Sequence, residues 1–254
     1  MNKKTFSCLA TALFLTIGII RAQQDAIYTD FQAEEFTSSS GLKLPYRVLY
    51  PENFDVSKKY PLVLFLHGAG ERGTDNNVQL KHGGAMFTNP VNRTKYPCIA
   101  IFPQCPQDLW WAGGINAPAE TEAGKAVKEL LDSFLSGNNV DLKRIYIMGL
   151  SMGGRGTFYM IENFPEIFAA AIPVCGWADI STLSNAAGKV KVRIFHGDAD
   201  PVVSAENSRQ AYKTLEKAGG EVEYIEYPAV EHNSWDYAFR EKDFFSWLFA
   251  QSKE

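Results

Sequence analysis

Apolar runs alternate with amphipathic stretches along most of the chain, and this pattern predicts strands that alternate with helices. Residues 61–66 and 98–102 are continuously apolar, as is typical of strands that are buried on both faces of a parallel sheet. Residues 120–135 instead carry apolar side chains at helical spacing. The predicted strands are residues 31–36, 42–50, 61–66, 98–102, 145–148, 168–174, 190–195 and 222–227. The predicted helices are residues 120–135, 204–218 and 243–251, with one more helix after residue 151.

This alternation predicts an α/β protein with a mostly parallel central sheet of about eight strands, flanked by helices on both faces. In such sheets, functional groups gather at the carboxyl ends of the strands. No repeat, low-complexity tract or linker divides residues 23–254, so we expect a single domain there. A chain of 254 residues with 46% hydrophobic content is long enough to bury most of its unfolded surface in one core.

The first 22 residues have the features of a signal peptide. Lys3 and Lys4 precede an apolar stretch at residues 9–20, and Ile20-Arg-Ala22 is a tolerable cleavage site. The stretch is too short to span a bilayer comfortably, although a retained N-terminal anchor is an alternative. We therefore expect a mature chain that starts near Gln23, is secreted or periplasmic, and has no membrane attachment.

Composition and charge argue against several functions. Cleavage would remove three basic residues and no acidic ones, which takes the formal net charge from −4 to −7. A mildly acidic protein has no electrostatic reason to bind nucleic acid or an anionic membrane. The histidines are scattered and no Cys-x-x-Cys motif is present, so we expect no metal and no cofactor. Export would permit one disulfide among the three remaining cysteines, which are Cys98, Cys105 and Cys175. The sequence does not show which two of them would pair.

The strongest chemical signal is Gly149-Leu-Ser-Met-Gly153, which lies between a predicted strand and a predicted helix. Glycines two residues before and after the serine let the backbone bend sharply and let the strand and the helix approach closely. Such a turn exposes the serine hydroxyl above the sheet edge, where a base and a substrate can reach it. The motif alone is common by chance, but the strand before it and the helix after it make Ser151 the candidate nucleophile.

A serine hydroxyl needs a base, and the base needs a carboxylate that orients it. His232 follows the last predicted strand, and Asp200 follows the strand at residues 190–195. The order Ser151, Asp200, His232 is that of the α/β-hydrolase fold. Asp198 is the alternative acid, but it lies nearer the strand, where we expect it to hold the turn.

The other histidines have structural interpretations. His67 and His196 each end a predicted strand before a glycine, where an imidazole commonly binds loop backbone. His82 lies in a polar segment and is expected to be solvated.

Attack by a serine creates an oxyanion, which backbone N–H groups must stabilise. The N–H of Met152, the residue after the nucleophile, is one predicted donor. The glycine-rich loop after the strand at residues 61–66 supplies the other, from Ala69 or alternatively from Gly70. A glycine turn needed only for chain reversal is the competing interpretation of this loop.

Five motifs along the chain carry a family resemblance. They are Tyr60-Pro-Leu-Val-Leu-Phe-Leu-His-Gly-Ala-Gly-Glu-Arg-Gly73, Pro103-Gln-Cys-Pro106, Gly149-Leu-Ser-Met-Gly-Gly154, His196-Gly-Asp-Ala-Asp200 and His232-Asn-Ser-Trp235. Together they resemble those of secreted bacterial α/β-hydrolases of the carboxylesterase or "predicted peptidase" type. They are also similar to those of polyhydroxybutyrate-depolymerase-like enzymes and of feruloyl or acetyl-xylan esterases. The resemblance covers nearly all of residues 30–250, implies the same triad, and does not specify a substrate.

Two features bear on the substrate. Residues 175–189, where lipases of this fold usually carry a helical lid, form a short connection, so we expect no lid domain. Residues 104–119 form a long loop with Trp110 and Trp111, and loops of that length are often functional. The two tryptophans could stack on a sugar ring or an aromatic acyl group, or they could pack over the edge of the core.

The sequence therefore predicts a secreted serine esterase without a cofactor. It would cleave small-molecule or polysaccharide-linked carboxylic esters through an acyl-enzyme. A serine peptidase with the same triad is the nearest alternative. A non-catalytic binding protein on the same fold is the alternative of a different class.

Overall fold

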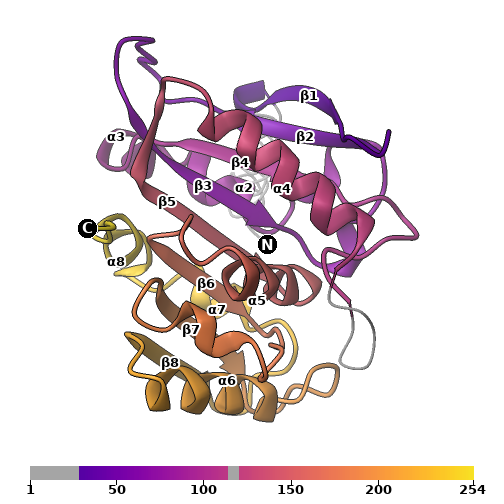
Figure 1. The fold of residues 1–254 in the computed structure, drawn as a ribbon, viewed down its shortest axis with the longest axis vertical. Helices are drawn as coiled ribbons and strands as arrows, with labels where there is room; N and C mark the ends of the chain where they lie inside the picture. Colours follow the sequence, from indigo (N-terminus) through magenta and orange to yellow (C-terminus); the bar gives the residue numbers. More distant parts are fainter. Residues whose placement is uncertain (1–28, 114–119) are drawn as a thin grey trace, which may run out of the picture.

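A central sheet of eight strands organises the protein (Figure 1). The computed structural model describes residues 29–113 and 120–254. The strand order is β1-β2-β4-β3-β5-β6-β7-β8, in which β1 and β2 pair antiparallel and every pair from β4 to β8 is parallel. The strands are β1 (Gln32–Thr37), β2 (Lys43–Leu49), β3 (Tyr60–Leu66), β4 (Ile99–Pro103), β5 (Val140–Leu150), β6 (Ala170–Val174), β7 (Lys191–Gly197) and β8 (Val222–Tyr227).

Both faces of the sheet are buried. Successive side chains of β5 enter two different hydrophobic clusters, one on each face. Ile145 and Ile147 belong to the cluster on one face, whereas Tyr146 and Met148 belong to the cluster on the other. This explains the continuously apolar strands in the sequence, since a strand between two helical layers has no solvent-facing side. The predicted fold class is confirmed: the chain has an α/β-hydrolase fold.

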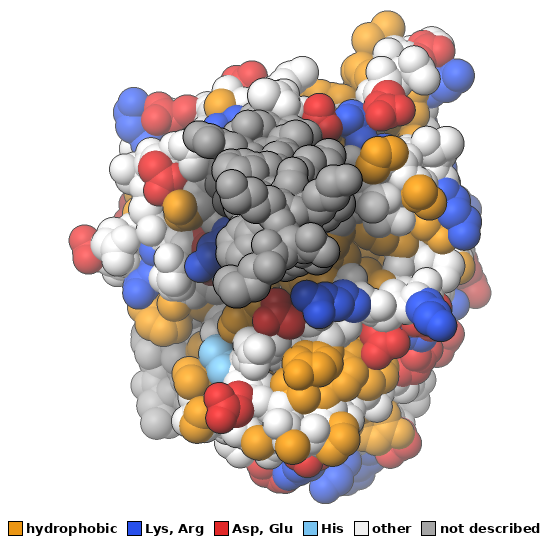
Figure 2. Space-filling model, turned by 180° about the vertical axis from the view of Figure 1, so that it is seen from behind, with side chains coloured by type: hydrophobic (Ala, Val, Ile, Leu, Met, Phe, Trp, Pro, Cys, Tyr) orange, Lys and Arg blue, Asp and Glu red, His pale blue; other side chains and the backbone are white. Residues whose placement is uncertain are grey.

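Helices cover each face of the sheet. The longer helices α4, α5 and α6 supply buried residues to the first cluster, and shorter helices contribute to the second. The helices are α2 (Gly84–Thr88), α3 (Pro90–Lys95), α4 (Glu122–Leu135), α5 (Met152–Asn163), α6 (Glu206–Lys217), α7 (Trp235–Ala238) and α8 (Phe244–Phe249). On the face turned away in Figure 1, hydrophobic side chains are interspersed with charged ones of both signs wherever described residues are visible (Figure 2).

The N-terminal prediction lies outside this structure. The predicted signal peptide, residues 1–22, falls outside the described residues. Within residues 29–113 and 120–254, no helix has the length and apolar character needed to cross a membrane.

The structure describes the three cysteines and the connection between β6 and β7, on which the sequence made predictions. The three cysteines that could have formed one disulfide are all buried free thiols, so no pair forms among the described cysteines. The connection between β6 and β7 carries only the short 3-10 helix Leu183–Ala186, in agreement with the predicted lack of a lid.

Candidate active site

Ser151 stands at a sharp turn between β5 and α5. Its backbone has φ 54° and ψ −115°, a region that costs a residue with a side chain on the order of 1–3 kcal/mol. The flanking glycines make this turn sterically possible. A Cβ atom on Gly149 would collide with the carbonyl oxygen of Gly153, and one on Gly153 would collide with that of Leu66. The strained backbone therefore depends on close packing that only glycine permits at these two positions.

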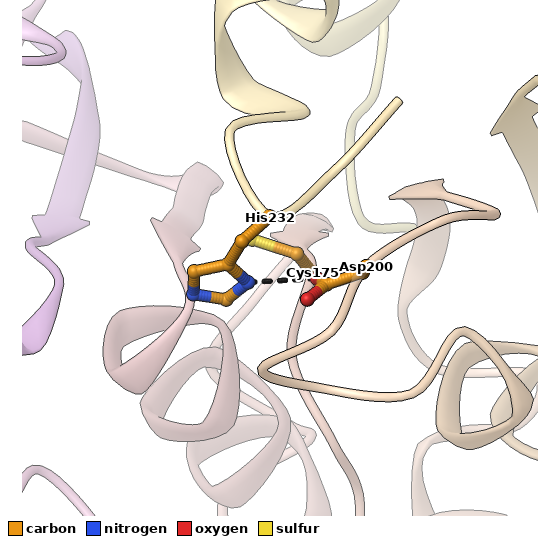
Figure 3. Close-up of side chains that lie close together, drawn as sticks. All are labelled: Cys175, Asp200 and His232. Carbon is orange, nitrogen blue, oxygen red and sulfur yellow. Dashed lines mark hydrogen bonds and ion pairs between the residues drawn. The ribbon is translucent and has the colours of Figure 1, made fainter. Parts of the chain in front are cut away.

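The structure brings the three predicted triad residues together from three loops. Ser151 Oγ lies 2.8 Å from His232 Nε2, and His232 Nδ1 lies 2.7 Å from Asp200 Oδ2. His232 follows β8 and Asp200 follows β7, so both reach the serine at the carboxyl edge of the parallel strands. Figure 3 shows the imidazole of His232 directed toward the carboxylate of Asp200. The hydrogen bonds form one continuous chain from hydroxyl to carboxylate.

The surroundings of Asp200 favour its ionised form. Burial opposes ionisation, but hydrogen bonds from His232 and from the backbone N–H groups of Val203 and Val202 outweigh it, so the pKa of Asp200 lies below its ordinary value. The Asp200 side chain is fully buried, which shields this charge from water. A buried carboxylate beside the imidazole can stabilise the imidazolium that forms when histidine takes up a proton.

Asp198, the alternative acid, faces a different partner. Its Oδ1 accepts a hydrogen bond of 2.6 Å from the backbone N–H of Ala229, and the residue is exposed. Asp198 therefore joins the loop after β7 to the loop after β8.

The two predicted oxyanion donors lie on either side of the nucleophile turn. Met152 begins α5, and the first N–H groups of a helix have no acceptor within the helix. Ala69 begins a short 3-10 helix directly after Gly68, and a Cβ atom on Gly68 would lie 2.8 Å from the Leu150 side chain. The glycine-rich loop therefore packs against the residue that precedes Ser151. That the N–H groups of Ala69 and Met152 act together stays a prediction.

The structural interpretation of His67 fits its contacts. The His67 ring is buried, its Nδ1 lies 2.6 Å from Gly68 O, and its Nε2 accepts a hydrogen bond of 2.9 Å from the backbone N–H of Cys105. Burial lowers the pKa of His67 to about 4, so it stays neutral near pH 7.

The expectation of a solvated His82 is wrong. His82 Nε2 lies 3.3 Å from Oε1 of the buried Glu71, and its ring lies 5.2 Å from that of Trp235. Glu71 belongs to the glycine-rich loop, and a buried carboxylate needs such a partner.

The two tryptophans predicted to bind substrate lie in different environments. Trp110 is 41% exposed, and the guanidinium of Arg72 lies 5.2 Å from its ring centroid. Trp111 is only 1% exposed, and its indole N–H donates a 3.1 Å hydrogen bond to the carbonyl oxygen of His67. The interpretation of Trp111 as a stacking surface is thus contradicted by its burial, whereas Trp110 keeps an accessible face.

Two neighbours of the triad were not predicted. The Trp235 ring meets the His232 ring edge-on at 5.5 Å, and Trp235 was visible in the sequence only as part of the motif that carries the histidine. The Cys175 thiol also approaches the site: its Sγ and ligand atoms of Asp200 and His232 lie within 4.8 Å of one another (Figure 3). No sequence signal pointed to Cys175.

Cys175, Asp200 and His232 are residue types that bind metals, and their ligand atoms lie close to one another. Burial raises the pKa of Cys175 to about 12, which keeps it a thiol, whereas metals prefer the thiolate. Asp200 and His232 already bind each other at 2.7 Å. The donor set therefore fits a hydrogen-bonded carboxylate–imidazole pair better than a metal site.

Comparisons with known proteins point to ester hydrolysis. The model of the dienelactone hydrolase family matches residues 104–242. Carboxylesterase SOBER1 of Arabidopsis thaliana is 26% identical over 189 residues, which are 67% of this chain and 82% of that protein. The bifunctional acetylxylan esterase/xylanase XynS20E of Neocallimastix patriciarum is 31% identical over 172 residues, and the match covers 67% of this chain but only 23% of that protein.

A solved structure agrees with these relatives. The crystal structure of a thermostable esterase superimposes with a TM-score of 0.85 at 39% identity, and it covers 89% of this chain and 64% of that one. The chain thus spans less than two thirds of both the esterase/xylanase and the thermostable esterase.

Proposed function

The chain belongs to the dienelactone hydrolase family and is a carboxylic-ester hydrolase, and we propose that it works as a serine esterase through an acyl-enzyme on Ser151. The continuous hydrogen bonding from Ser151 through His232 to Asp200 is the observation that supports this proposal most strongly. The strained turn, which raises the hydroxyl at the strand end, supports it independently.

The reaction would begin at the serine hydroxyl. Ser151 Oγ attacks the ester carbonyl carbon while its proton passes to His232 Nε2, and Asp200 stabilises the resulting imidazolium. The tetrahedral intermediate collapses when His232 gives this proton to the departing alcohol. Water then attacks the acyl-enzyme with His232 again as base, and the carboxylic acid leaves as Ser151 regains its proton. The N–H groups of Met152 and Ala69 would stabilise the oxyanion in both halves.

We expect kcat/KM to fall at acidic pH through a single ionisation. His232 must be neutral to accept the serine proton, so the reaction stops once the imidazole takes up a proton. The pKa of His196 is lowered by burial, and that of Asp200 also lies below its ordinary value, so we expect neither to add a second proton to this step. A pH–rate profile on a soluble ester measures this. His232 is not the base if the rate stays flat down to pH 4. It is also not the base if the fall of kcat/KM at acidic pH, the acid limb of the profile, requires several protons.

The substrate would be an ester of a carbohydrate or another bulky alcohol. The short connection after β6 leaves the described part of the site without a helical lid, and Trp110 offers an exposed aromatic face next to Arg72. Arg72 Nε donates to the carbonyl oxygen of Ala69, so this surface is connected to the proposed oxyanion loop. Aromatic faces suit sugar rings and feruloyl groups. Such a substrate fits the export that the N-terminal residues predict.

Trp110→Ala should therefore lower kcat/KM in a substrate-dependent way. We expect a loss of roughly 5- to 30-fold on feruloyl or sugar-linked esters, from lost aromatic pairing and contact area. The loss should be small on p-nitrophenyl acetate, which is too short to reach the indole. Leu142→Ala is a control, because Leu142 is an exposed apolar residue at the start of β5, at the end opposite Ser151. Equal losses of Trp110→Ala on all esters would refute this role.

A serine peptidase with the same triad is the alternative function, and a substrate panel separates the two. Acetyl, butyryl and feruloyl esters, acylated oligosaccharide, emulsified triglyceride and peptidyl p-nitroanilides should be compared on the purified protein. We expect the soluble and carbohydrate esters to be preferred, with ordinary saturation and no rate increase at the triglyceride interface. Preferred cleavage of the anilides would favour the peptidase.

A further inference from the structure

A second histidine reaches the carboxylate of the proposed triad acid. Asp200 Oδ1 accepts hydrogen bonds of 2.8 and 2.9 Å from the backbone N–H groups of Val202 and Val203. Oδ2 accepts the 2.7 Å bond from His232 Nδ1, and His196 Nε2 lies 3.1 Å from the same oxygen. The atom that orients the catalytic imidazole thus has a second imidazole partner.

The contacts of His196 determine its tautomer. His196 Nε2 lies 2.9 Å from the carbonyl oxygen of Val203, which can only accept, so Nε2 carries the hydrogen. This N–H is shared between Val203 O and Asp200 Oδ2. The other nitrogen, Nδ1, then has a lone pair and accepts a 2.7 Å hydrogen bond from the hydroxyl of Ser208. Ser208 lies on α6, so this helix supports the ring from behind.

The environment keeps His196 neutral as well as fixed. His196 and Ser208 are both 0% exposed, and burial lowers the pKa of His196. The charged groups that face it are Asp200 and His232 from the site and Glu226, which is its register partner on β8. Glu226 is itself paired with Arg209 of α6 at 2.7 Å. A neutral donor therefore contacts the triad acid without adding charge to it.

We propose that His196 is a positioning residue for Asp200, which holds Oδ2 toward His232 and moderates the basicity of the carboxylate. This inference rests on the proposed triad and adds the residue that contacts its acid. The sequence position of His196, four residues before Asp200 at the end of β7, keeps its ring under the carboxylate. Without the shared N–H, Oδ2 would lose one of its two described hydrogen bonds, so it would be positioned less firmly and would attract the His232 imidazolium more strongly, while Val202 and Val203 still hold Oδ1.

The matched variants are His196→Phe and His196→Gln. Phenylalanine fills the space but removes the donor, whereas the glutamine amide can place an N–H near the position of Nε2. We expect His196→Phe to lower kcat roughly 10- to 100-fold with KM nearly unchanged, the effect of losing a hydrogen bond to a charged group. The acid limb of its kcat/KM profile should move upward by about 0.5 to 1 pH unit. His196→Gln should retain both kcat and the limb within a few-fold and a few tenths of a unit. Ser208→Ala should shift the limb in the same direction by less.

A purely structural role for His196 predicts a different result. His196→Phe would then lose thermal stability while its acid limb stayed at the wild-type pH, and this outcome would overturn the proposal. If His196→Phe does not fold, an unshifted limb in Ser208→Ala has the same meaning.

Nitrogen NMR of histidine-labelled wild-type protein gives a readout that does not depend on catalysis. It should show His196 as the neutral Nε2–H tautomer between pH 6 and 8, and an Nδ1–H tautomer or a charged ring would contradict the proposal. Failure of the proposed function would appear separately, as an inactive wild type or an active Ser151→Ala variant.

Discussion

Ser151→Ala should abolish ester hydrolysis and leave the protein folded. Removal of a triad nucleophile typically lowers kcat by on the order of 10⁴–10⁶. The serine hydroxyl lies on a half-buried residue at the apex of the turn and donates to His232, so its loss removes one hydrogen bond and little packing. Alanine keeps a Cβ at φ 54°, and the backbone strain of the turn therefore stays the same. Steady-state kinetics and a thermal unfolding curve on the same preparation measure both parts.

The control for this variant is Ser136→Ala, which removes an exposed hydroxyl at the C-terminal end of α4, a helix that carries none of the triad residues. It should retain full activity. A Ser151→Ala protein that kept a tenth of the wild-type rate would mean that another group is the nucleophile.

Asp200→Asn should lower kcat by about 10⁴-fold, the size of the effect of the equivalent substitution in a serine-protease triad. The asparagine amide would place an N–H opposite His232 Nδ1, which would then have to accept a hydrogen bond. The ring hydrogen would move to Nε2, and Nε2 could no longer accept the serine proton. Val202 and Val203 could still donate to the remaining amide oxygen, so we expect the loop to keep its conformation.

Asp198→Asn is the matched comparison for the acid, because it changes the same residue type two positions earlier. Its Oδ1 accepts only from the exposed Ala229 N–H among the hydrogen bonds described, and asparagine can preserve that bond. We expect its kcat to stay within a few-fold of wild type. Kinetics at pH 8, where histidine is mostly neutral, would rank the two variants, and the reverse ranking would identify Asp198 as the acid.

The fold was accessible from the sequence because its central strands are unambiguous. A strand such as β3, buried on both faces, shows no polar alternation and ends at a glycine-rich loop. β5 was predicted too short, since Asp141, Lys143 and Arg144 make its first half polar where it runs beyond the buried part of the sheet. The short helices α2, α3 and α7 were not predicted, because four to six residues cannot display a helical period.

The residues of the candidate site could be predicted where both their chemistry and their order along the chain point to them. They could not be predicted where burial in the folded protein determines which residue is accessible. Ser151, Asp200 and His232 each follow a strand, so the topology alone brings them to one edge. Trp110 and Trp111 are adjacent and chemically identical, and only the tertiary packing determines that one is exposed and the other is covered. The same holds for the contact of His196 with Asp200, which depends on how α6 packs behind β7.

The most direct test of Ser151 as the nucleophile is to trap a covalent bond on its hydroxyl oxygen. Diethyl 4-nitrophenyl phosphate phosphorylates an activated serine and releases 4-nitrophenol, and mass spectrometry of the intact protein and its peptides locates the label. We expect one diethylphosphoryl group on the peptide that carries Ser151, with loss of esterase activity in proportion to labelling, and no label on Ser151→Ala. A wild-type protein that hydrolyses esters but is labelled elsewhere, or loses activity without a label on Ser151, would contradict it.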